Sequence, residues 1–307
     1  MDISVVIPLL NEKDSLEELT AKIAGQCSSI NKSFEIIYID DGSTDGSFDL
    51  LLDLKKRFTE IRIIRFRRNF GKSAALSEGF RKASGNIVIT MDADLQDDPA
   101  EIPRLINKIE ENLDLVSGWK KKRHDPLGKT IPSKFFNMVT RLLSGIKIHD
   151  FNCGLKAYRK DVIKAIPVYG ELHRYLPVLA HWRGFKVDEI EVTHHARQHG
   201  KSKFGARRFL SGFFDLLTVL FITRYHAKPL HLFGFFGMSL SAVGFIILAY
   251  LSVLWFSGYG IGNRPLLFLG ILLVIVGVQS FSLGLIGEMI TSTRERSIQY
   301  AIRDEID

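Results

Sequence analysis

Residues 85–99 read GNIVITMDADLQDDP, an apolar run that passes directly into a group of aspartates. The β-branched residues predict a short buried strand at 86–92. Carboxylates this close together repel one another unless a cation lies among them. Carboxylate and amide oxygens are the hard ligands that Mg²⁺ or Mn²⁺ prefers. The stretch therefore predicts a divalent metal site at the end of this strand, formed by Asp92, Asp94 and Gln96.

The same stretch also has a plainer interpretation, a solvated turn that starts a helix. An aspartate just before a proline is a typical helix N-cap, so we assign Asp97 and Asp98, which precede Pro99, to that role. The position of Asp92 and Asp94 at a strand end favours the metal for those two.

Strand-like and helical segments alternate through the first two-thirds of the chain. The expected strands before the middle of the chain are 3–10, 34–40, 61–66, 86–92 and 114–119. Alternation with short loops indicates an α/β domain with a parallel or mostly parallel sheet. Ligands of such sheets bind beyond the carboxyl ends of the strands. We therefore expect the acidic segments 40–47 and 92–98 to meet in one crevice.

The segment DDGSTDGS at 40–47 resembles a calcium loop only superficially, because Leu52 stands where a bidentate glutamate is needed. Ser43, Thr44 and Asp45 are interpreted as turn and helix-cap residues. Asp41, at a strand end, can accept a hydrogen bond from a base or from a ribose hydroxyl.

The C-terminal third has a different composition. Residues 229–263 and 265–287 contain no Asp, Glu, Lys or Arg, and each run exceeds the ~20 residues that cross a bilayer. We expect two transmembrane helices, at about 230–257 and 265–288. Residues 206–228, apolar but interrupted by a charge, are expected to form an amphipathic helix in the membrane interface.

Lysine and arginine flank the two spans on their outer sides, whereas the loop between the spans holds only Arg264. This distribution predicts that both ends of the hairpin, and the large N-terminal domain, face the cytoplasm. The first residues do not resemble a signal peptide. The two cysteines, Cys27 and Cys153, give no indication of a disulfide framework, which fits a reducing compartment.

The chain has 41 Lys and Arg against 34 Asp and Glu, a formal charge of +7. Much of the excess lies in the loop KKKRHDPLGK at 120–129 and around RQHGKSKF at 197–204. Such loops either contact anionic lipid headgroups or bind substrate phosphates. We assign Lys120–Lys122 to headgroups. Lys72 is left open between a phosphate contact and a helix-start lysine. The histidines lack the spacing of a zinc site, and no nucleic-acid partner is expected.

Four segments in this order resemble the inverting GT-A glycosyltransferases of family 2: VVIPLLNE at 5–12, IDDGSTDGS at 39–47, DADLQDDP at 92–99 and RQHGKSKF at 197–204. The subgroup is that of the polyprenyl-phosphate sugar transferases, of the dolichol-phosphate-mannose synthase and bactoprenol glucosyltransferase type, and the similarity covers the whole chain. The family usually has an aromatic residue where Leu10 stands.

The resemblance implies a Rossmann-like GT-A domain over 1–205, an interfacial helix over 206–228, a membrane hairpin over 229–290 and a cytoplasmic tail over 291–307. It also implies roles for single residues. Nucleotide or other substrate contacts fall on Pro8, Glu12, Asp41, Asp92 and Ala93, and metal contacts on Asp92, Asp94 and Gln96. Phosphate contacts fall on Arg123, Arg197 and Lys203, the last two within the element R-x-x-G-x-S-K that closes over the diphosphate. Asp94, Arg197 and Asp150 are the candidate catalytic residues.

Asp150, in HDFNCG, matches an acidic position near the acceptor that is often proposed as the base. A phosphate monoester has a second pKa of ~6 and is largely dianionic at neutral pH. The acceptor therefore needs little help to lose a proton, which favours Asp150 as a group that positions the acceptor. Both roles stay open at this point.

The implied reaction is inverting transfer of one hexose from a UDP- or GDP-linked sugar to a polyprenyl phosphate, with Mg²⁺ or Mn²⁺ as cofactor. The enzyme would be a multi-pass protein of the inner (cytoplasmic) membrane in contact with lipid. It would be a homo-oligomer, since related enzymes can be tetramers. The alternatives are a family-2 enzyme with another lipid or polysaccharide acceptor, and a non-catalytic scaffold that binds nucleotide sugar.

Overall fold

The computed structural model describes residues 1–121, 137–142, 144–166, 168, 170, 172–195, 229–261 and 264–294. These residues fall into two compact units, one N-terminal and one formed by two long C-terminal helices. Each unit is considered by itself. The expected interfacial helix at 206–228 and the tail from 295 onward lie outside the described residues, so the predicted domain boundaries there stay predictions.

The described residues of the N-terminal unit form a seven-stranded sheet in the order β3-β2-β1-β4-β6-β5-β7. Its strands are β1 (Ile3–Leu9), β2 (Phe34–Asp40), β3 (Ile61–Arg65), β4 (Ile87–Thr90), β5 (Leu115–Trp119), β6 (Lys156–Arg159) and β7 (Val187–Glu191). Every pairing is parallel except those that β6 makes with β4 and β5. The expected mostly parallel α/β domain is therefore confirmed.

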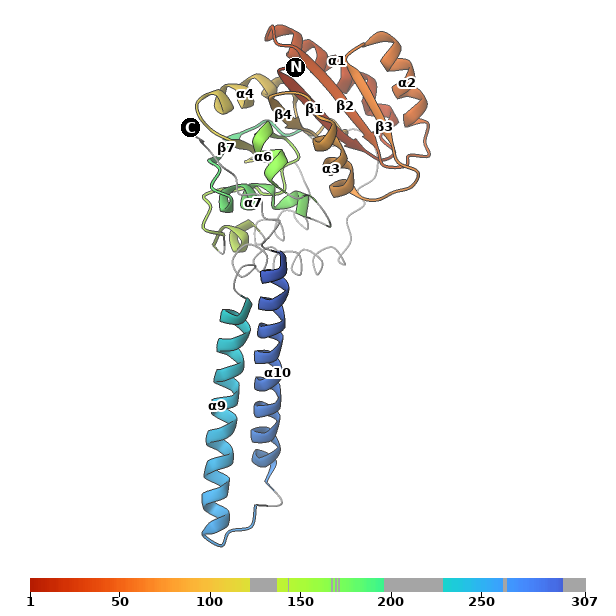
Figure 1. The fold of residues 1–307 in the computed structure, drawn as a ribbon. Helices are drawn as coiled ribbons and strands as arrows, with labels where there is room; N and C mark the ends of the chain where they lie inside the picture. The colour runs from red at the N-terminus through yellow and green to blue at the C-terminus, as the bar shows by residue number, and fades with distance from the viewer. Residues whose placement is uncertain are drawn as a thin grey trace. The chain divides into compact units, whose positions relative to one another are not determined.

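Helices cover the sheet, as Figure 1 shows. They are α1 (Lys13–Ser29), α2 (Ser47–Arg57), α3 (Lys72–Lys82), α4 (Ile102–Glu110), α6 (Lys160–Ala165) and α7 (Leu176–Trp182), with 3₁₀ turns η1 (Pro99–Glu101) and η2 (Leu172–Arg174). Alternate residues of β1 are buried on opposite faces, as the period of a strand requires. Ile3 and Val5 belong to the core beneath α1 and α4, whereas Val6 lies against Gly79 of α3.

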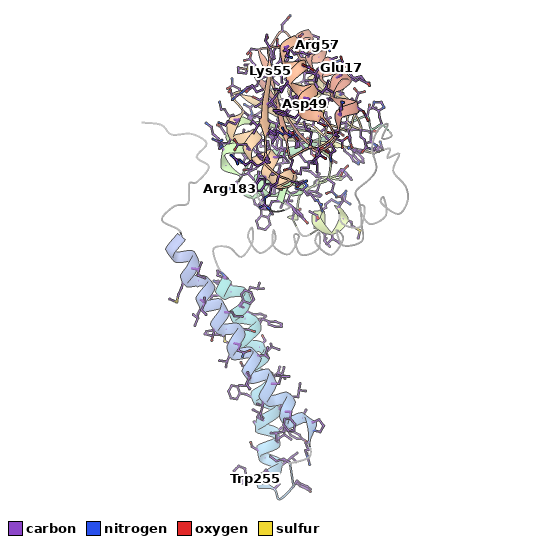
Figure 2. The ribbon with its side chains drawn as sticks, turned by 90° about the vertical axis from the view of Figure 1, so that its right-hand side faces the viewer. Glu17, Asp49, Lys55, Arg57, Arg183 and Trp255 are labelled. Atoms are coloured by element: carbon purple, nitrogen blue, oxygen red, sulfur yellow. The ribbon has the colours of Figure 1, made fainter. Side chains whose placement is uncertain are left out.

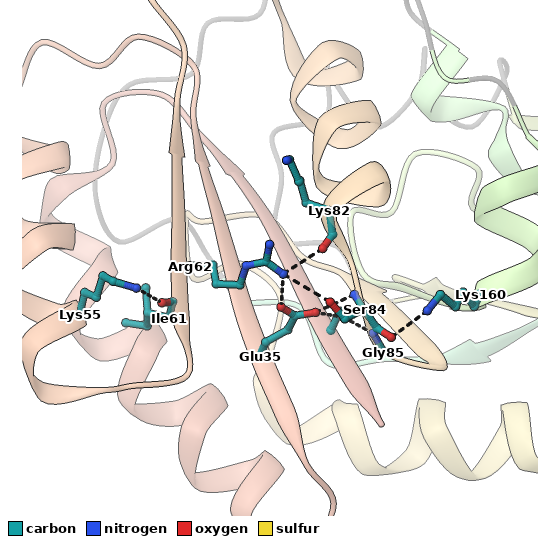
Figure 3. Close-up of polar contacts among 9 residues, drawn as sticks. Glu35, Lys55, Ile61, Arg62, Lys82, Ser84, Gly85 and Lys160 are labelled. Atoms are coloured by element: carbon teal, nitrogen blue, oxygen red, sulfur yellow. Dashed lines mark hydrogen bonds and ion pairs between the residues drawn. The ribbon is translucent and has the colours of Figure 1, made fainter. Parts of the chain in front are cut away.

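The edge of the sheet at the N-terminal ends of the strands is closed by the polar network in Figure 3. The buried Glu35 carboxylate accepts hydrogen bonds from Ser4 Oγ at 2.6 Å, Arg62 at 2.7 Å and the Ser84 N–H at 2.7 Å. Burial alone would raise the pKa of Glu35, but these donors outweigh burial and lower it. This carboxylate is fully used in holding strands together, on the side opposite the acidic cluster at 92–98.

The second unit consists of α9 (Pro229–Phe256) and α10 (Pro265–Arg294). Both helices are long and apolar enough to cross a membrane, with mean hydropathies of 2.1 and 2.5 in their apolar segments. Their starts agree with the predicted spans within one residue. Figure 2 shows their side chains pointing outward around the pair, with Trp255 near the end of α9. The large apolar side chains are exposed (Phe235, for example, by 74%), as expected of a surface that faces lipid.

Glycines bring α9 and α10 close together. A Cβ at Gly237 would lie 2.8 Å from Phe281 N, and one at Gly244 would lie 2.8 Å from the Gly270 carbonyl oxygen. Small residues at such contacts let membrane helices approach closely. Near the start of α9, the Leu230 N–H donates to Glu288 Oε2 at 3.2 Å. Small residues thus let the two helices of one hairpin pack closely, and the predicted oligomeric state stays a prediction.

Candidate active site

The direction of β6 decides which segments meet at the acidic edge of the sheet. β1, β2 and β4 end at this edge, and β6 begins there because it runs the opposite way. The segment before β6 therefore lies beside the segment after β4. Thr90 Oγ1 donates to the Gly154 carbonyl at 2.8 Å, which joins the two. The two acidic segments therefore lie at the same edge of the sheet, together with residues 149–155, and their meeting in one crevice stays a prediction.

Three of the residues predicted to contact the donor, Pro8, Glu12 and Ala93, lie at this edge. Pro8 is in β1, and Glu12 is half-buried at the start of α1 with its N–H 3.2 Å from Ser47 Oγ. Ala93 is buried, and its carbonyl lies 2.5 Å from Ser15 Oγ. Their contacts with a nucleotide stay predictions.

Asp41 supports the loop that precedes α3. Its carboxylate accepts the Phe70 N–H at 2.7 Å and the Gly71 N–H at 2.9 Å. Each carboxylate oxygen can accept a second hydrogen bond, so this arrangement is compatible with the predicted nucleotide contact. An open hollow of about 510 Å³ adjoins it, lined by Gly42, Ser43, Thr44, Arg65, Phe66 and Arg67.

Ser43, Thr44 and Asp45 act as turn residues, as predicted. Ser43 Oγ accepts the Asn11 N–H at 2.9 Å, and the Thr44 N–H donates to the Asn11 side chain at 2.8 Å. Asp45 accepts the Ser47 N–H at 3.0 Å at the start of α2. These contacts connect the loops after β1 and β2.

Asp92 forms an ion pair with Lys72, the first residue of α3. Burial alone would raise the pKa of the Asp92 carboxyl, but Lys72, Lys120 and Lys156 outweigh burial and lower it to about 2. The sequence alone did not decide between the two roles considered for Lys72, and the structure places it among the acidic residues. The sequence feature that could have indicated this role is the position of Lys72, directly after a glycine and at the start of a helix beside strand ends.

Gly154 leaves room for the Asp92 carboxylate. A Cβ on Gly154 would lie 2.6 Å from Asp92 Oδ2, well inside van der Waals contact. The close approach of the 149–155 segment to Asp92 therefore requires a glycine at this position.

Asp94 and Gln96 are brought together by a turn at Leu95, whose φ of 58° is in the left-handed region. The Gln96 N–H donates to Asp94 Oδ1 at 3.2 Å, and Asp94 is 8% exposed. Among the described residues no group of three His, Cys, Asp or Glu side chains could hold a metal ion. One carboxylate and an amide oxygen fit Mg²⁺ or Mn²⁺ that keeps other positions for phosphate oxygens. Lys72 pairs with Asp92 Oδ1, so a metal ion at Asp92 would bind through Oδ2 or would displace Lys72 from Oδ1.

Asp97 and Asp98 differ in role. Asp98 is the cap of η1, with Oδ1 accepting the Ala100 N–H at 2.9 Å, as predicted. Asp97 is not in a solvated turn. Its side chain is fully buried and lies 2.7 Å from Lys120 Nζ, which is itself mostly buried. The assignment of Lys120 to lipid headgroups is therefore wrong: its ammonium group is used inside the domain. Burial alone would lower the pKa of Lys120, but Asp97 outweighs it and the pKa is raised.

Asp150 is buried, with 1% exposure, on the same side of the sheet as Asp92. Its Oδ1 accepts the Asn152 N–H at 3.1 Å, and the Asp150 carbonyl lies 3.4 Å from Ser117 Oγ. Lys156, also buried, donates to the Cys153 carbonyl and interacts electrostatically with Asp150 and Asp92. Burial lowers the pKa of Lys156. No sequence pattern indicates a role for Lys156, because it lies within an otherwise ordinary short strand.

The segment after β7 is fixed onto the acidic segment. The His195 N–H donates to the Gln96 carbonyl at 2.9 Å, and His195 Nε2 lies 3.1 Å from Asp98 Oδ2. The Thr193 hydroxyl donates to Glu101 at 2.9 Å. The described part of this segment ends at His195. The predicted phosphate-binding residues Arg123, Arg197 and Lys203 lie outside the described residues.

Comparisons with known proteins match this chain to an enzyme family. The family model for glycosyl transferase family 2 matches residues 4–167. Dodecaprenyl-phosphate galacturonate synthase of Rhizobium johnstonii is 39% identical over all of this chain and 94% of its own length. Undecaprenyl-phosphate 4-deoxy-4-formamido-L-arabinose transferase of Pseudomonas paraeruginosa is 36% identical over 93% of this chain and 84% of its own length.

Among solved structures, glucosyl-3-phosphoglycerate synthase from Mycobacterium tuberculosis, crystallised with Mn²⁺, UDP-glucose and phosphoglyceric acid, has a similar fold. The TM-score is 0.56 at 19% identity, over 74% of this chain and 82% of that one. This similarity shows the GT-A type of fold and confirms the fold class expected from the sequence.

Proposed function

The chain belongs to glycosyl transferase family 2, and from this we propose that it transfers one sugar residue from a nucleotide-diphosphate sugar to the phosphate of a polyprenyl phosphate. The anomeric configuration is inverted, because the acceptor phosphate displaces the nucleotide diphosphate directly. The product is a polyprenyl-phosphate sugar for modification of a cell-envelope glycan or glycolipid.

One observation carries the proposal: similarity to enzymes named for polyprenyl phosphates extends over the whole chain, hairpin included. A nucleotide-sugar domain alone needs no membrane helices, whereas a polyprenyl acceptor is held in the bilayer. The two apolar helices α9 and α10 supply the membrane association that this acceptor requires. We place the protein in the inner membrane with its N-terminal unit in the cytoplasm, following the lysine and arginine distribution.

The donor half of the site lies around the segment 92–96. Asp94 and Gln96, with Asp92, would hold Mg²⁺ or Mn²⁺ together with the diphosphate. When bound, the ion would neutralise charge that develops on the leaving diphosphate. Arg197, Lys203 and Arg123 would add further positive charge to the same phosphates, which stabilises the transition state more than the ground state. Pro8, Glu12, Asp41 and Ala93 would bind the rest of the donor.

The acceptor half involves Asp150. The acceptor phosphate is largely dianionic at neutral pH, since its second pKa is ~6, and it is already a competent nucleophile. We therefore assign Asp150 to positioning the acceptor and its counter-ions. Replacing it by Asn would lower turnover, and a base role predicts that high pH would restore part of the loss. Unchanged loss at high pH supports positioning.

The set of candidate donor sugars is wider than the hexoses expected from the sequence. The two relatives are named for a galacturonate and for a formamido-arabinose. A thermal-shift panel of UDP- and GDP-linked sugars with Mn²⁺ would identify the donor, because only a ligand that binds the native state raises the melting temperature.

The decisive experiment is a radiolabel transfer assay. Purified full-length protein in detergent is supplied with the donor identified above and a short-chain polyprenyl phosphate. Label should move to the lipid phase and be released as the free sugar by mild acid. The Asp94→Asn variant serves as the inactive control. Absence of labelled lipid with every donor, or transfer to a polysaccharide acceptor instead, would contradict the proposal.

A further inference from the structure

The residue just before Asp150 is held on two sides by one carboxylate. Glu189, in β7, accepts the backbone N–H of His149 through Oε2 at 2.7 Å, and its Oε1 is bonded to His149 Nδ1. The Glu189 side chain is only 9% exposed. A carboxylate that receives a main-chain and a side-chain donor from the same residue fixes both the position and the orientation of that residue.

The neighbouring strand adds a second support. Ser117 of β5 is the register partner of Glu189 in the parallel β5–β7 pair. Ser117 Oγ lies 3.4 Å from the Asp150 carbonyl. Paired positions in the middle of two adjacent strands thus contact successive residues, His149 and Asp150, of the segment that leads into β6. Both strands therefore help to hold this segment in place.

An aromatic contact completes the support. The His149 ring stacks on Trp119, the last residue of β5, with ring centroids 4.3 Å apart and planes at 18°. Lys121 Nζ lies 5.5 Å from the centroid of the same Trp119 ring and 3.1 Å from Glu191 Oε2. His149 is therefore held by Glu189 on one side and by a ring face on another, although its side chain is 45% exposed.

We propose that Glu189 is a positioning residue for sugar transfer, which acts by holding His149 and thereby fixes Asp150 against the acceptor phosphate. This inference rests on the proposed function, in which Asp150 faces the acceptor. Asp150 has little freedom of its own, because its carboxylate accepts the Asn152 N–H. Its place relative to the donor is therefore set by the main chain at 149–150, and Glu189 holds that main chain.

The geometry predicts an effect on the acceptor and not on the donor. Glu189 touches neither the 92–96 segment nor Lys72 in any hydrogen bond or ion pair of the described residues. A displacement of a positioning group by about 1 Å can cost up to roughly 100-fold in rate. Loss of the Glu189 contacts should therefore raise the KM for polyprenyl phosphate, or lower kcat, while the donor KM stays constant.

The test compares three full-length variants with the wild type. Glu189→Ala removes both contacts, and Glu189→Gln keeps an acceptor for the His149 N–H. Glu111→Ala is the matched control, since Glu111 forms an exposed pair with Lys108 and, among the described residues, has no printed contact with His149, Trp119 or Asp150. Each is assayed for acceptor and donor KM and for kcat, and amide hydrogen exchange is followed in a peptide that covers residues 149–152.

We expect Glu189→Ala to raise the acceptor KM, or lower kcat, by about 10-fold with the donor KM unchanged, and to speed exchange of the His149 amide. Glu189→Gln should stay within about 3-fold of the wild type, and Glu111→Ala should match the wild type. Equal changes in donor and acceptor KM, or unchanged acceptor kinetics in Glu189→Ala, would overturn the proposal.

The two proposals can fail separately. If the wild type makes no polyprenyl-phosphate sugar, the proposed function is wrong, and the exchange data alone still show whether Glu189 protects the His149 amide. If the wild type is active and Glu189→Ala leaves the acceptor kinetics unchanged, the positioning role is wrong and the function stands.

Discussion

Lys120 Nζ lies 2.7 Å from Asp97 Oδ1, and both side chains are enclosed by the domain. The pair connects the residue after β5 with the acidic segment after β4. Asp97 also forms an isolated antiparallel bridge with His194. The carboxylate is thus placed where three segments of the active-site edge meet, and its charge is balanced by one lysine.

Removing that lysine should strongly destabilise the N-terminal unit. Lys120→Met would leave a buried carboxylate without its partner, which typically costs about 3–5 kcal/mol. We expect a fall of several degrees in the melting temperature, measured by differential scanning fluorimetry. Adding Asp97→Leu to the same protein should recover part of the loss, because the unpaired charge is then absent.

Lys121→Met is the matched control for this prediction. Lys121 is the next residue and forms an exposed pair with Glu191, with side chains 55% and 50% exposed. Such pairs are worth about 0.2–1 kcal/mol. A similar fall in melting temperature in both variants would show that the buried Lys120–Asp97 pair matters no more for stability than the exposed pair.

Metal removal should abolish transfer, and the loss should be reversible. Excess chelator is expected to stop the reaction, with recovery on addition of Mn²⁺ or Mg²⁺, because the departing diphosphate then regains its counter-charge. Asp94→Asn should weaken Mn²⁺ binding in the presence of nucleotide at least 10-fold by electron paramagnetic resonance titration. Full activity in chelator would refute the metal assignment.

Gly154→Ala should disturb Asp92 without unfolding the protein. The new methyl group would lie 2.6 Å from Asp92 Oδ2, so the carboxylate or the 149–155 segment must move. We expect donor affinity to fall by about 10-fold, or ~1.4 kcal/mol, measured by isothermal titration with nucleotide sugar. Gly25→Ala, in α1 with open space around it, should leave affinity unchanged and stabilise the helix slightly.

Stability should fall in mild acid because of His173. Burial, followed by nearby Lys72 and Arg174, holds the pKa of His173 well below its usual range, and Nδ1 lies 2.8 Å from Ser73 Oγ. The unfolded chain takes up a proton near pH 6.5 whereas the folded protein does not. The unfolded state then binds more protons, so stability is fully present above about pH 6.5 and decreases as the pH falls below it.

His173→Asn tests this pH dependence, since the amide can still bond Ser73. Between pH 7.5 and 5.5 the wild-type melting temperature should fall more steeply than that of the variant. The difference should not exceed about 1.4 kcal/mol per pH unit, the limit for one proton. Parallel curves for the two proteins would mean that His173 does not cause the loss.

Local patterns predicted the elements of the fold well. β2 was expected at 34–40 and lies there, and the two apolar helices begin within one residue of the expected positions. The strand expected at 86–92 ends at Thr90, because the chain turns into the site and Leu95 adopts a left-handed conformation. The order of the strands was not predictable, since insertion of β6 between β4 and β5 depends on tertiary packing.

The charged residues of the site were harder to assign. Asp98 was recognised as a cap because the signal, an aspartate before a proline, is local. The sequence does not distinguish the role of Asp97 from that of Asp98, because the partner of Asp97, Lys120, is 23 positions away and only the fold brings them together. Lys156 was missed as a member of the site for the same reason, and Lys72 stayed open because its pair with Asp92 also depends on the fold. Sequence patterns identify a charged residue, but its burial and its partner depend on the whole sheet.

The reversed strand β6 has a consequence for synthesis on the ribosome. Within the part of the chain that the structure describes, β5 pairs with β6 and β7 alone, and the edge of β4 that faces away from β1 pairs with β6 alone. A nascent chain that has emerged through residue 121 therefore contains β1 to β5 but lacks β6. Without β6, β5 cannot join the sheet, and the N–H and C=O groups on one edge of β4 stay unpaired. Such edges template intermolecular pairing. Truncated chains that end before Lys156 should aggregate, and translation pauses in this interval would be hazardous for the cell.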